Sequence, residues 1–309
     1  MGIKARIRGA IQSAVKHSDW YVNGVFSDCG KFWDQKVFNL DVVNLGSTSA
    51  VCAFDYSGLP IKGANWAMSR NYLAGDKAIL ENFSSLLKAK GAVVIIPLCP
   101  FSSLSGRYDG FDDRYYTFLY PSSIPGFSKA RQNAVKDMQA NPVPYYPAFQ
   151  LWLALRKRVG AIFGLGTRRP PSADSMERNA DFWISSWMRE FSLDSLDDPL
   201  SLVNRDAMDQ AVCRLNGIVA YCRELGHRPV FTVPPVYAAL AARFSKNARA
   251  RFVYDMVERL ADKDVVMLDY MDDAEFSADI SLFDNSYLLS AAGAKKFTRR
   301  ILKDIGLIS

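Results

Sequence analysis

A serine that closes an apolar run is the residue of this chain best placed for chemistry. Residues 37–45 (VFNLDVVNL) predict a core strand, and Gly46-Ser47 follows it as a turn. A serine hydroxyl is a poor nucleophile at neutral pH, so it needs a base within hydrogen-bond reach and a group that orients that base. Ser47 could equally be a helix N-cap, a position that serine favours.

The residues available to activate Ser47 are not the usual ones. The chain has two histidines, and both lie in other contexts: His17 in a basic N-terminal segment, and His227 between a helix end and a strand start. Activation would fall to a carboxylate such as Asp284 or to a lysine. A carboxylate of ordinary pKa is a weak base near neutrality. Asp284 and Asn285 are also typical of a turn, so catalysis stays open on this reasoning.

The elements that must position these residues alternate between strands and helices. This alternation predicts an α/β fold, a three-layer α/β/α sandwich with a mainly parallel sheet. Strands are expected at residues 37–45, 92–98, 229–233 and 265–270. Helices are expected at residues 76–90, 204–225, 244–261 and 291–305. We interpret residues 1–309 as one domain with an amphipathic N-terminal segment (1–36) and a helical and loop insertion or cap (104–200).

Turns at the carboxyl ends of these strands predict a binding site, because open parallel sheets hold ligands there. The turns are Gly46-Ser47-Thr48-Ser49, Pro100-Phe101-Ser102, Pro234-Pro235-Val236 and the loop from Asp284 to Tyr287. Aromatic residues near them, namely Trp66, Phe101 and Tyr287, could be sugar platforms or ordinary packing residues.

Several of these segments resemble the SGNH/GDSL hydrolases. NLGSTS (residues 44–49) resembles the family's Gly-Asp-Ser-like turn, with Ser47 in the position of the nucleophile. LFDNSYLLSAAGAKKFT (282–298) resembles its late Asp-x-x-His loop and last helix. The resemblance covers about residues 41–305 except the insertion, and it implies an SGNH- or flavodoxin-like fold. The family's aspartate and histidine fall at Asn285 and Leu288, or at Asp284 and Tyr287 in the other register.

The resemblance also implies an oxyanion hole. Gly63 and Asn65 are the candidates for its glycine and asparagine donors, although Gly63-Ala64-Asn65 could be merely a turn. The family's later Gly-x-Asn-Asp turn is replaced by PLCPFSS, so Ser102 or Ser103 would stand in for it. The missing histidine leaves two interpretations. One is a carbohydrate esterase or O-acyltransferase that uses Ser47, and the other is a catalytically degenerate domain that binds a glycan or a partner.

A narrower resemblance concerns SGNH-like proteins encoded among bacterial capsule and cell-surface polysaccharide genes. NLGSTSAVCAFDY, GANWAMS, VVIIPLCPFSS and GAKKFT carry it. It implies that the partner is a carbohydrate or an acylated glycan. We expect no organic cofactor and no metal, because the Asp112-Asp113 pair has no further ligand at helical spacing.

Composition and charge restrict the partners and the location that we expect for this protein. A net charge of +6 is small, and its clusters (Lys4 to Arg8, 156–158 and 168–169) are typical of a solvated basic face. They could also contact an anionic membrane surface, through residues 1–16 and 149–169. We find no nucleic-acid motif, no secretory signal and no apolar stretch long enough to span a bilayer. The five cysteines predict free thiols, buried at Cys52 and Cys99, and a cytoplasmic location. The oligomeric state stays open.

Overall fold

The structure, a computed structural model, describes residues 3–34, 37–108, 110–147 and 171–309. It divides the chain into two compact units, each assembled from two stretches of sequence. The helical unit comprises Met1–Gln35 and Gly110–Pro170, and the α/β unit comprises Lys36–Asp109 and Pro171–Ser309. The sequence analysis treated the whole chain as one domain with an insertion at 104–200. In the structure, residues 104–109 and 171–200 of that insertion belong to the α/β unit.

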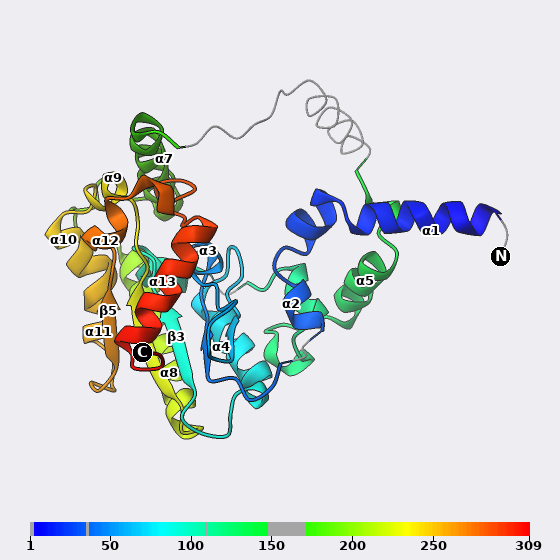
Figure 1. The fold of residues 1–309 in the computed structure, drawn as a ribbon, viewed down its shortest axis with the longest axis horizontal. Helices are drawn as coiled ribbons and strands as arrows, with labels where there is room; N and C mark the ends of the chain where they lie inside the picture. Colours follow the sequence, from blue (N-terminus) through cyan, green and yellow to red (C-terminus); the bar gives the residue numbers. More distant parts are fainter. Residues whose placement is uncertain (1–2, 35–36, 109, 148–170) are drawn as a thin grey trace. The chain divides into compact units, whose positions relative to one another are not determined.

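A five-stranded sheet, parallel throughout, forms the centre of the α/β unit, and it confirms the predicted α/β fold. Its order is β2-β1-β3-β4-β5 (Figure 1). The strands are β1 (Val42–Asn44), β2 (Gly63–Asn65), β3 (Val93–Pro97), β4 (Arg228–Val233) and β5 (Val266–Asp269). β3 is buried at every residue, as its run of β-branched side chains predicts. The chain leaves β1 for β2 on one side and enters β3 on the other, so the carboxyl ends of β1 and β3 form a topological switch point.

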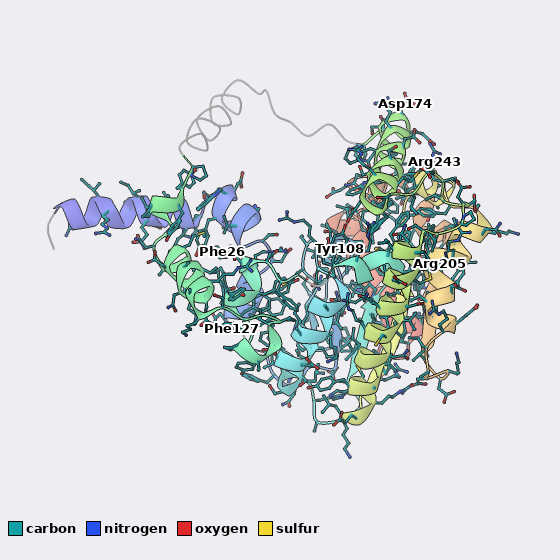
Figure 2. The ribbon with its side chains drawn as sticks, turned by 180° about the vertical axis from the view of Figure 1, so that it is seen from behind. Phe26, Tyr108, Phe127, Asp174, Arg205 and Arg243 are labelled. Carbon is teal, nitrogen blue, oxygen red and sulfur yellow. The ribbon has the colours of Figure 1, made fainter. Side chains whose placement is uncertain are left out.

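Helices cover both faces of this sheet. α13 (Ala291–Asp304) lies in front of the strands in Figure 1 and packs on α3 (Thr48–Ala53). α8 (Leu202–Glu224) lies in front when the molecule is seen from behind in Figure 2, and it packs against α4 (Leu73–Phe83). The core beneath α13 is aromatic, with Phe54, Phe276 and Phe297 buried. This layered arrangement follows from apolar stripes that each helix must bury.

Three predicted elements differ in extent. β1 covers only Val42–Asn44 of the run 37–45, since Val37 and Phe38 are exposed. The helix expected to reach residue 90 ends at Phe83 and continues as a 3₁₀ turn (Ser84–Leu86). The helix expected at 244–261 is broken into α10 (Lys246–Arg249), a π-helical turn (Ala250–Tyr254) and α11 (Asp255–Glu258). Smaller helices of the unit are α9 (Ala238–Ala241), α12 (Ala274–Ser277) and the 3₁₀ turn η8 (Ile280–Leu282).

Two elements that the sequence placed in the insertion complete the carboxyl edge of the sheet. The 3₁₀ helix η3 (Ser102–Arg107) follows β3 and packs closely on α8. α7 (Ala173–Phe191) begins with a reciprocal capping box between Ser172 and Ser175. Arg243, labelled in Figure 2 beyond the end of α9, forms ion pairs with Glu177 and Asp181 of α7 at 2.8 and 2.9 Å. These contacts attach α7 to the α/β unit.

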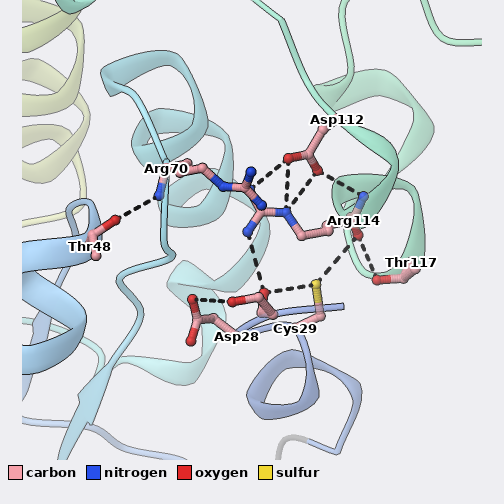
Figure 3. A network of polar contacts seen from close by, with 8 residues as sticks. Asp28, Cys29, Thr48, Arg70, Asp112, Arg114 and Thr117 are labelled. Atoms are coloured by element: carbon pink, nitrogen blue, oxygen red, sulfur yellow. Dashed lines mark hydrogen bonds and ion pairs between the residues drawn. The ribbon is translucent and has the colours of Figure 1, made fainter. Parts of the chain in front are cut away.

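A buried arginine paired with an aspartate stabilises the helical unit. Arg114, in η4 (Asp113–Thr117), is 3% exposed and donates from Nε and Nη2 to the Asp112 carboxylate (Figure 3). The fork geometry satisfies a charge that would otherwise be costly to bury. Around this pair lie Cys29, which precedes α2 (Gly30–Trp33), and the stacked rings of Phe32 and Phe118. The other elements are α1 (Ile3–Lys16), α5 (Lys129–Ala140), the π-helical turn η1 (Trp20–Val25) and the 3₁₀ turns η5 (Pro121–Ser123) and η6 (Val143–Tyr145).

The five cysteines are free, as expected. Cys29 and Cys222 are buried, whereas Cys52 and Cys99, expected to be buried, are half-buried. Among the described residues, no helix combines the length and the apolar character needed to cross a membrane.

A test of this packing uses Gly106 of η3, where a Cβ atom would lie 1.9 Å from the carbonyl oxygen of Ala207 in α8. We expect Gly106→Ala to lower the free energy of unfolding by roughly 1–3 kcal/mol, because backbone must move to admit the methyl group. Gly217→Ala on α8 is the control, since its Cβ would meet only the flexible Lys77 side chain. It should be neutral or stabilising by up to about 1 kcal/mol. Equal denaturation midpoints for both variants would contradict the close approach of η3 to α8.

Candidate functional site

A cavity of about 370 Å³ opens at the carboxyl ends of β1 and β3, the switch point of the sheet. This is where open α/β sheets bind ligands. Its volume falls within the range of about 300–1,000 Å³ that is usual for small-molecule sites. The lining residues come from the turn after β1, the start of α4, η3, α7 and the loop before α13. Those used below are Ser47, Asn71, Asp76, Cys99, Phe101, Ser102, Ser105, Trp183, Trp187, Phe191 and Tyr287.

Ser47 lies at the N-cap position of α3, and its hydroxyl does not cap the helix. The side chain is half-buried and lines the cavity. Within the described ranges the Ser47 hydroxyl has no hydrogen-bond partner. The position therefore agrees with the N-cap interpretation, but the hydroxyl makes no capping hydrogen bond.

Asp76 fixes the turn that contains Ser47 through hydrogen bonds. The Gly46 N–H donates to Asp76 Oδ1 at 2.8 Å, and Asn71 Nδ2 donates to the same oxygen at 2.6 Å. Gly46 has a φ of +116°, and a Cβ there would lie 2.7 Å from the Ala50 side chain, so only glycine fits. Asp76 is buried, and this burial raises the pKa of its carboxyl to about 7, although the bonds from Gly46 and Asn71 lower it in part.

One wall of the cavity is aromatic. Trp183 and Trp187 stand one turn apart on α7, with ring centroids 5.4 Å apart, and Tyr287 contacts both rings at 5.0 Å. Phe101 contacts Trp187 at 5.0 Å and stacks on Phe191. Phe101 and Tyr287 both pack against Trp187, in agreement with the packing interpretation, and both also line the cavity. Trp66 is fully buried and packs on Phe83 away from the cavity lining.

Two buried polar atoms of the lining residues have no protein partner in the described part of the chain. They are the Oγ of Ser105, a residue only 7% exposed, and the indole Nε1 of Trp183. Buried polar groups almost always find a partner, so each exception asks for a water or a ligand. Both atoms are themselves buried, and both belong to residues that line the cavity beside its aromatic wall.

The predicted oxyanion donors Gly63 and Asn65 do not line the cavity. They form β2, an edge strand rather than a turn. Asn65 Nδ2 donates to the carbonyl oxygens of Ala50, Val51 and Phe54 at the end of α3. Asn65 Oδ1 accepts from Asn44 Nδ2 and from the Ala67 N–H. The amide is thus occupied in joining α3 to the sheet. Gly63 lies against the ring of Tyr56, which leaves no room for a Cβ.

The residues predicted for the site in the loop before α13 differ in whether they line the cavity. Tyr287 reaches the cavity, and burial raises its pKa well above the ordinary value. Asp284 is exposed and is not among the lining residues. Asn285 Oδ1 accepts from the N–H groups of Tyr287 and Leu288, so its side chain closes the turn. Ser286 donates from its N–H and its hydroxyl to Asn179 Oδ1 of α7, which ties this loop to the aromatic wall.

Ser102 lines the cavity as predicted for a residue after β3, although its hydroxyl is engaged locally. It accepts from the Cys99 N–H at 2.9 Å and lies 3.3 Å from Cys99 Sγ, to which it donates. His227 precedes β4 at the amino end of the sheet, and His17 belongs to the helical unit. Within the described ranges no cluster of three or more His, Cys, Asp or Glu side chains could hold a metal ion.

Sequence reasoning missed four residues that line the cavity. Asp76 was interpreted only as the start of a helix, and its position beside the Gly46 turn is a tertiary fact. Trp183 and Trp187 were assigned to an insertion, although their spacing of four residues puts both on one helix face. Ser105 had no signal, because the 3₁₀ helix that positions it follows a strand in a segment without clear periodicity.

Comparisons with known proteins identify no family. No family model matches the chain, and no curated protein sequence matches it. A solved structure described as that of "a putative platelet activating factor from Streptococcus pneumonia" is similar in structure, with a TM-score of 0.40 and 10% identity. The match covers 98% of this chain and 99% of that one. At this level it assigns neither a substrate nor an activity to the present protein.

Asp76 makes the stability of the α/β unit depend on pH. Its pKa is about 7 in the folded protein and about 3.9 in an unfolded chain, so the folded state binds its proton more tightly. The wild type should therefore lose stability relative to Asp76→Asn as pH rises from about 4 to about 7, with no further change above that. Urea denaturation across this range measures the difference.

Asp55→Asn is the control for this experiment. Hydrogen bonds from Ser57 lower the pKa of the half-buried Asp55 carboxyl, so its contribution to stability is lost only as pH falls into the acid range. A difference between wild type and Asp76→Asn that stays constant from pH 4 to 7 would show that the Asp76 carboxyl is not buried beside Gly46.

Proposed function

We propose that the α/β unit is a catalytically degenerate SGNH-like domain that binds a carbohydrate or an acylated glycan in the cavity beside Ser47. The observation that carries this proposal is the combination of an aromatic wall with polar groups that have no protein partner, Ser105 Oγ and Trp183 Nε1. Sugars present apolar faces to aromatic rings and hydroxyl groups to donors and acceptors, so this lining suits them.

The lack of a conventional base favours binding over turnover. His227 precedes β4 at the amino end of the sheet, His17 belongs to the helical unit, and Asp284 does not line the cavity. The expected oxyanion donor Asn65 is bonded to three backbone carbonyls. A serine without an activated base retains little nucleophilicity at neutral pH. A role in surface-polysaccharide biosynthesis rests on the sequence resemblance and belongs to the proposal.

Binding can be measured by tryptophan fluorescence after a glycan panel of neutral, uronic-acid and O-acetylated oligosaccharides has supplied a ligand. We expect Trp183→Phe and Ser105→Ala each to weaken binding by roughly 3–10-fold, the loss of one hydrogen bond. Ser47→Ala should change affinity by less than about threefold, because the hydroxyl is not required for chemistry. Trp33→Phe, in the helical unit, is the matched control. No binding in the panel, or affinities insensitive to Trp183 and Ser105, would refute the proposal.

One observation favours acyl transfer or ester hydrolysis as a second candidate. Asp76 lines the same cavity as Ser47, and its pKa of about 7 suits a general base better than an ordinary carboxylate would. In this alternative Ser47 attacks an acyl carbonyl and forms an acyl-enzyme. The serine proton passes to the Asp76 carboxylate and from there to the oxygen of the breaking ester bond, so the original alcohol departs. Water or a glycan hydroxyl then attacks the acyl-enzyme, takes up the acyl group and returns its proton to Ser47 through Asp76.

Labelling with a serine-reactive phosphonate separates the two candidates. A degenerate domain should remain unlabelled and should release no acetate from O-acetylated glycans. An enzyme that uses Asp76 would be labelled at Ser47, with a rate that rises as pH increases through about 7 and falls at least about 100-fold in Asp76→Asn. Ser102→Ala serves as the control serine, since it lines the same cavity. Turnover that is lost in Ser47→Ala would overturn the binding proposal.

A further inference from the structure

The positive charge of this protein is concentrated in the helical unit. Its sequence holds 14 Lys and Arg against 6 Asp and Glu, a net charge of +8. The α/β unit holds 24 Lys and Arg against 26 Asp and Glu, a net charge of −2, which together account for the +6 of the whole chain. A field of one sign attracts anionic partners to the unit that carries it. The helical unit is thus electrostatically distinct from the unit with the cavity.

Helix α1 adds an exposed apolar face to this charge. It spans Ile3–Lys16 and contains no acidic residue. Ile7 and Ile11, one turn apart, lie on the same helix face and are 55% and 49% exposed. Arg6 and Arg8 flank Ile7 and are also exposed. Aliphatic side chains of this size are seldom left in water at successive turns unless another surface covers them.

The apolar face continues onto the turn after α5. Gln12 Nε2 donates to the carbonyl oxygen of Ala140 at 2.6 Å, and this bond holds α1 beside the end of α5. A groove of about 310 Å³ opens between α1 and η6. We define the α1–η6 patch as Ile7, Arg8, Ile11, Val143 and Pro144, all of which line this groove. The patch is therefore a surface of two elements rather than a single helix stripe.

We propose that the α1–η6 patch docks the helical unit onto an anionic lipid bilayer. The aliphatic side chains of the patch enter the boundary between headgroups and acyl chains, and Arg6 and Arg8 remain at the level of the lipid phosphates. The net charge of +8 supplies the long-range attraction to the leaflet. Residues 149–169, which the sequence analysis also considered for membrane contact, lie outside the described residues.

The character of the patch selects a bilayer over a nucleic acid. Proteins bind nucleic-acid backbones with dense cations and polar side chains, and they stack bases on aromatic rings. In this patch the side chains next to the exposed arginines are aliphatic, namely Ile7, Ile11 and Val143. Such side chains gain free energy in hydrocarbon and gain little from a phosphate backbone.

Vesicle co-sedimentation of the full chain tests this proposal. Phosphatidylcholine vesicles that contain phosphatidylglycerol should retain the protein, and pure phosphatidylcholine vesicles should not. Arg6→Gln with Arg8→Gln should weaken binding roughly 30-fold, because each cation near an anionic surface contributes independently. Ile7→Glu with Ile11→Glu should weaken it by more than about 100-fold, since two aliphatic anchors are lost. Added salt should weaken wild-type binding and have less effect on the arginine variant.

Matched controls lie in the α/β unit. Arg205→Gln with Arg299→Gln removes two exposed cations, and Leu202→Glu with Val203→Glu replaces two apolar residues that are 70% and 57% exposed. Both controls should bind the anionic vesicles as the wild type does, and circular dichroism verifies the fold of every variant. Four results would overturn the proposal: equal retention on neutral vesicles, no retention on either, tighter binding to a short DNA duplex, or a lipid-free dimer that Ile7→Glu with Ile11→Glu dissociates.

Discussion

The carboxylate of Asp76 holds together the part of the molecule on which the candidate site depends. It lies inside the α/β unit and accepts from the Gly46 N–H and from Asn71. Gly46 can take its left-handed conformation because it has no Cβ, and that conformation turns the chain from β1 into α3. Asn71 and Asp76 flank the start of α4, so one buried group fixes β1, α3 and α4 at the same point. Ser47, the next residue of the chain, lines the cavity as a consequence.

This arrangement places Ser47 beside the cavity without the usual groups that activate a serine. Ser47 directly follows β1 and lies beside a cavity at the switch point of the sheet. Two residues that the sequence suggested would assist it are engaged elsewhere: the amide of Asn65, the expected oxyanion donor, joins α3 to β2, and Asn285 closes a turn. What the cavity retains is a wall of aromatic rings, with Ser105 and Trp183 among its lining residues, each of which has a buried polar atom without a protein partner in the described part of the chain. Such a lining is suited to binding.

Strongly patterned segments of this chain could be predicted from sequence, and residues defined by tertiary contact could not. The β-branched run of β3 and the amphipathic pattern of α13 indicate which of their side chains are buried. The parallel α/β fold could therefore be predicted from them. Asp76 looked like an ordinary first-turn acid, because nothing local shows that Gly46 lies against it. Asn65 looked like an oxyanion donor, because only the fold reveals the three carbonyls at the end of α3. Residues 246–258 show a continuous amphipathic pattern, and this pattern does not reveal that a π-helical turn interrupts the helix.

A crystal structure of the protein soaked with an oligosaccharide tests the central claim, that the cavity beside Ser47 is a binding site without conventional serine chemistry. The account predicts sugar oxygens within hydrogen-bond distance of Ser105 Oγ and Trp183 Nε1, a sugar ring against the aromatic wall, and no covalent bond to Ser47. An empty cavity at saturating ligand, or an acyl group attached to Ser47 Oγ, would contradict it.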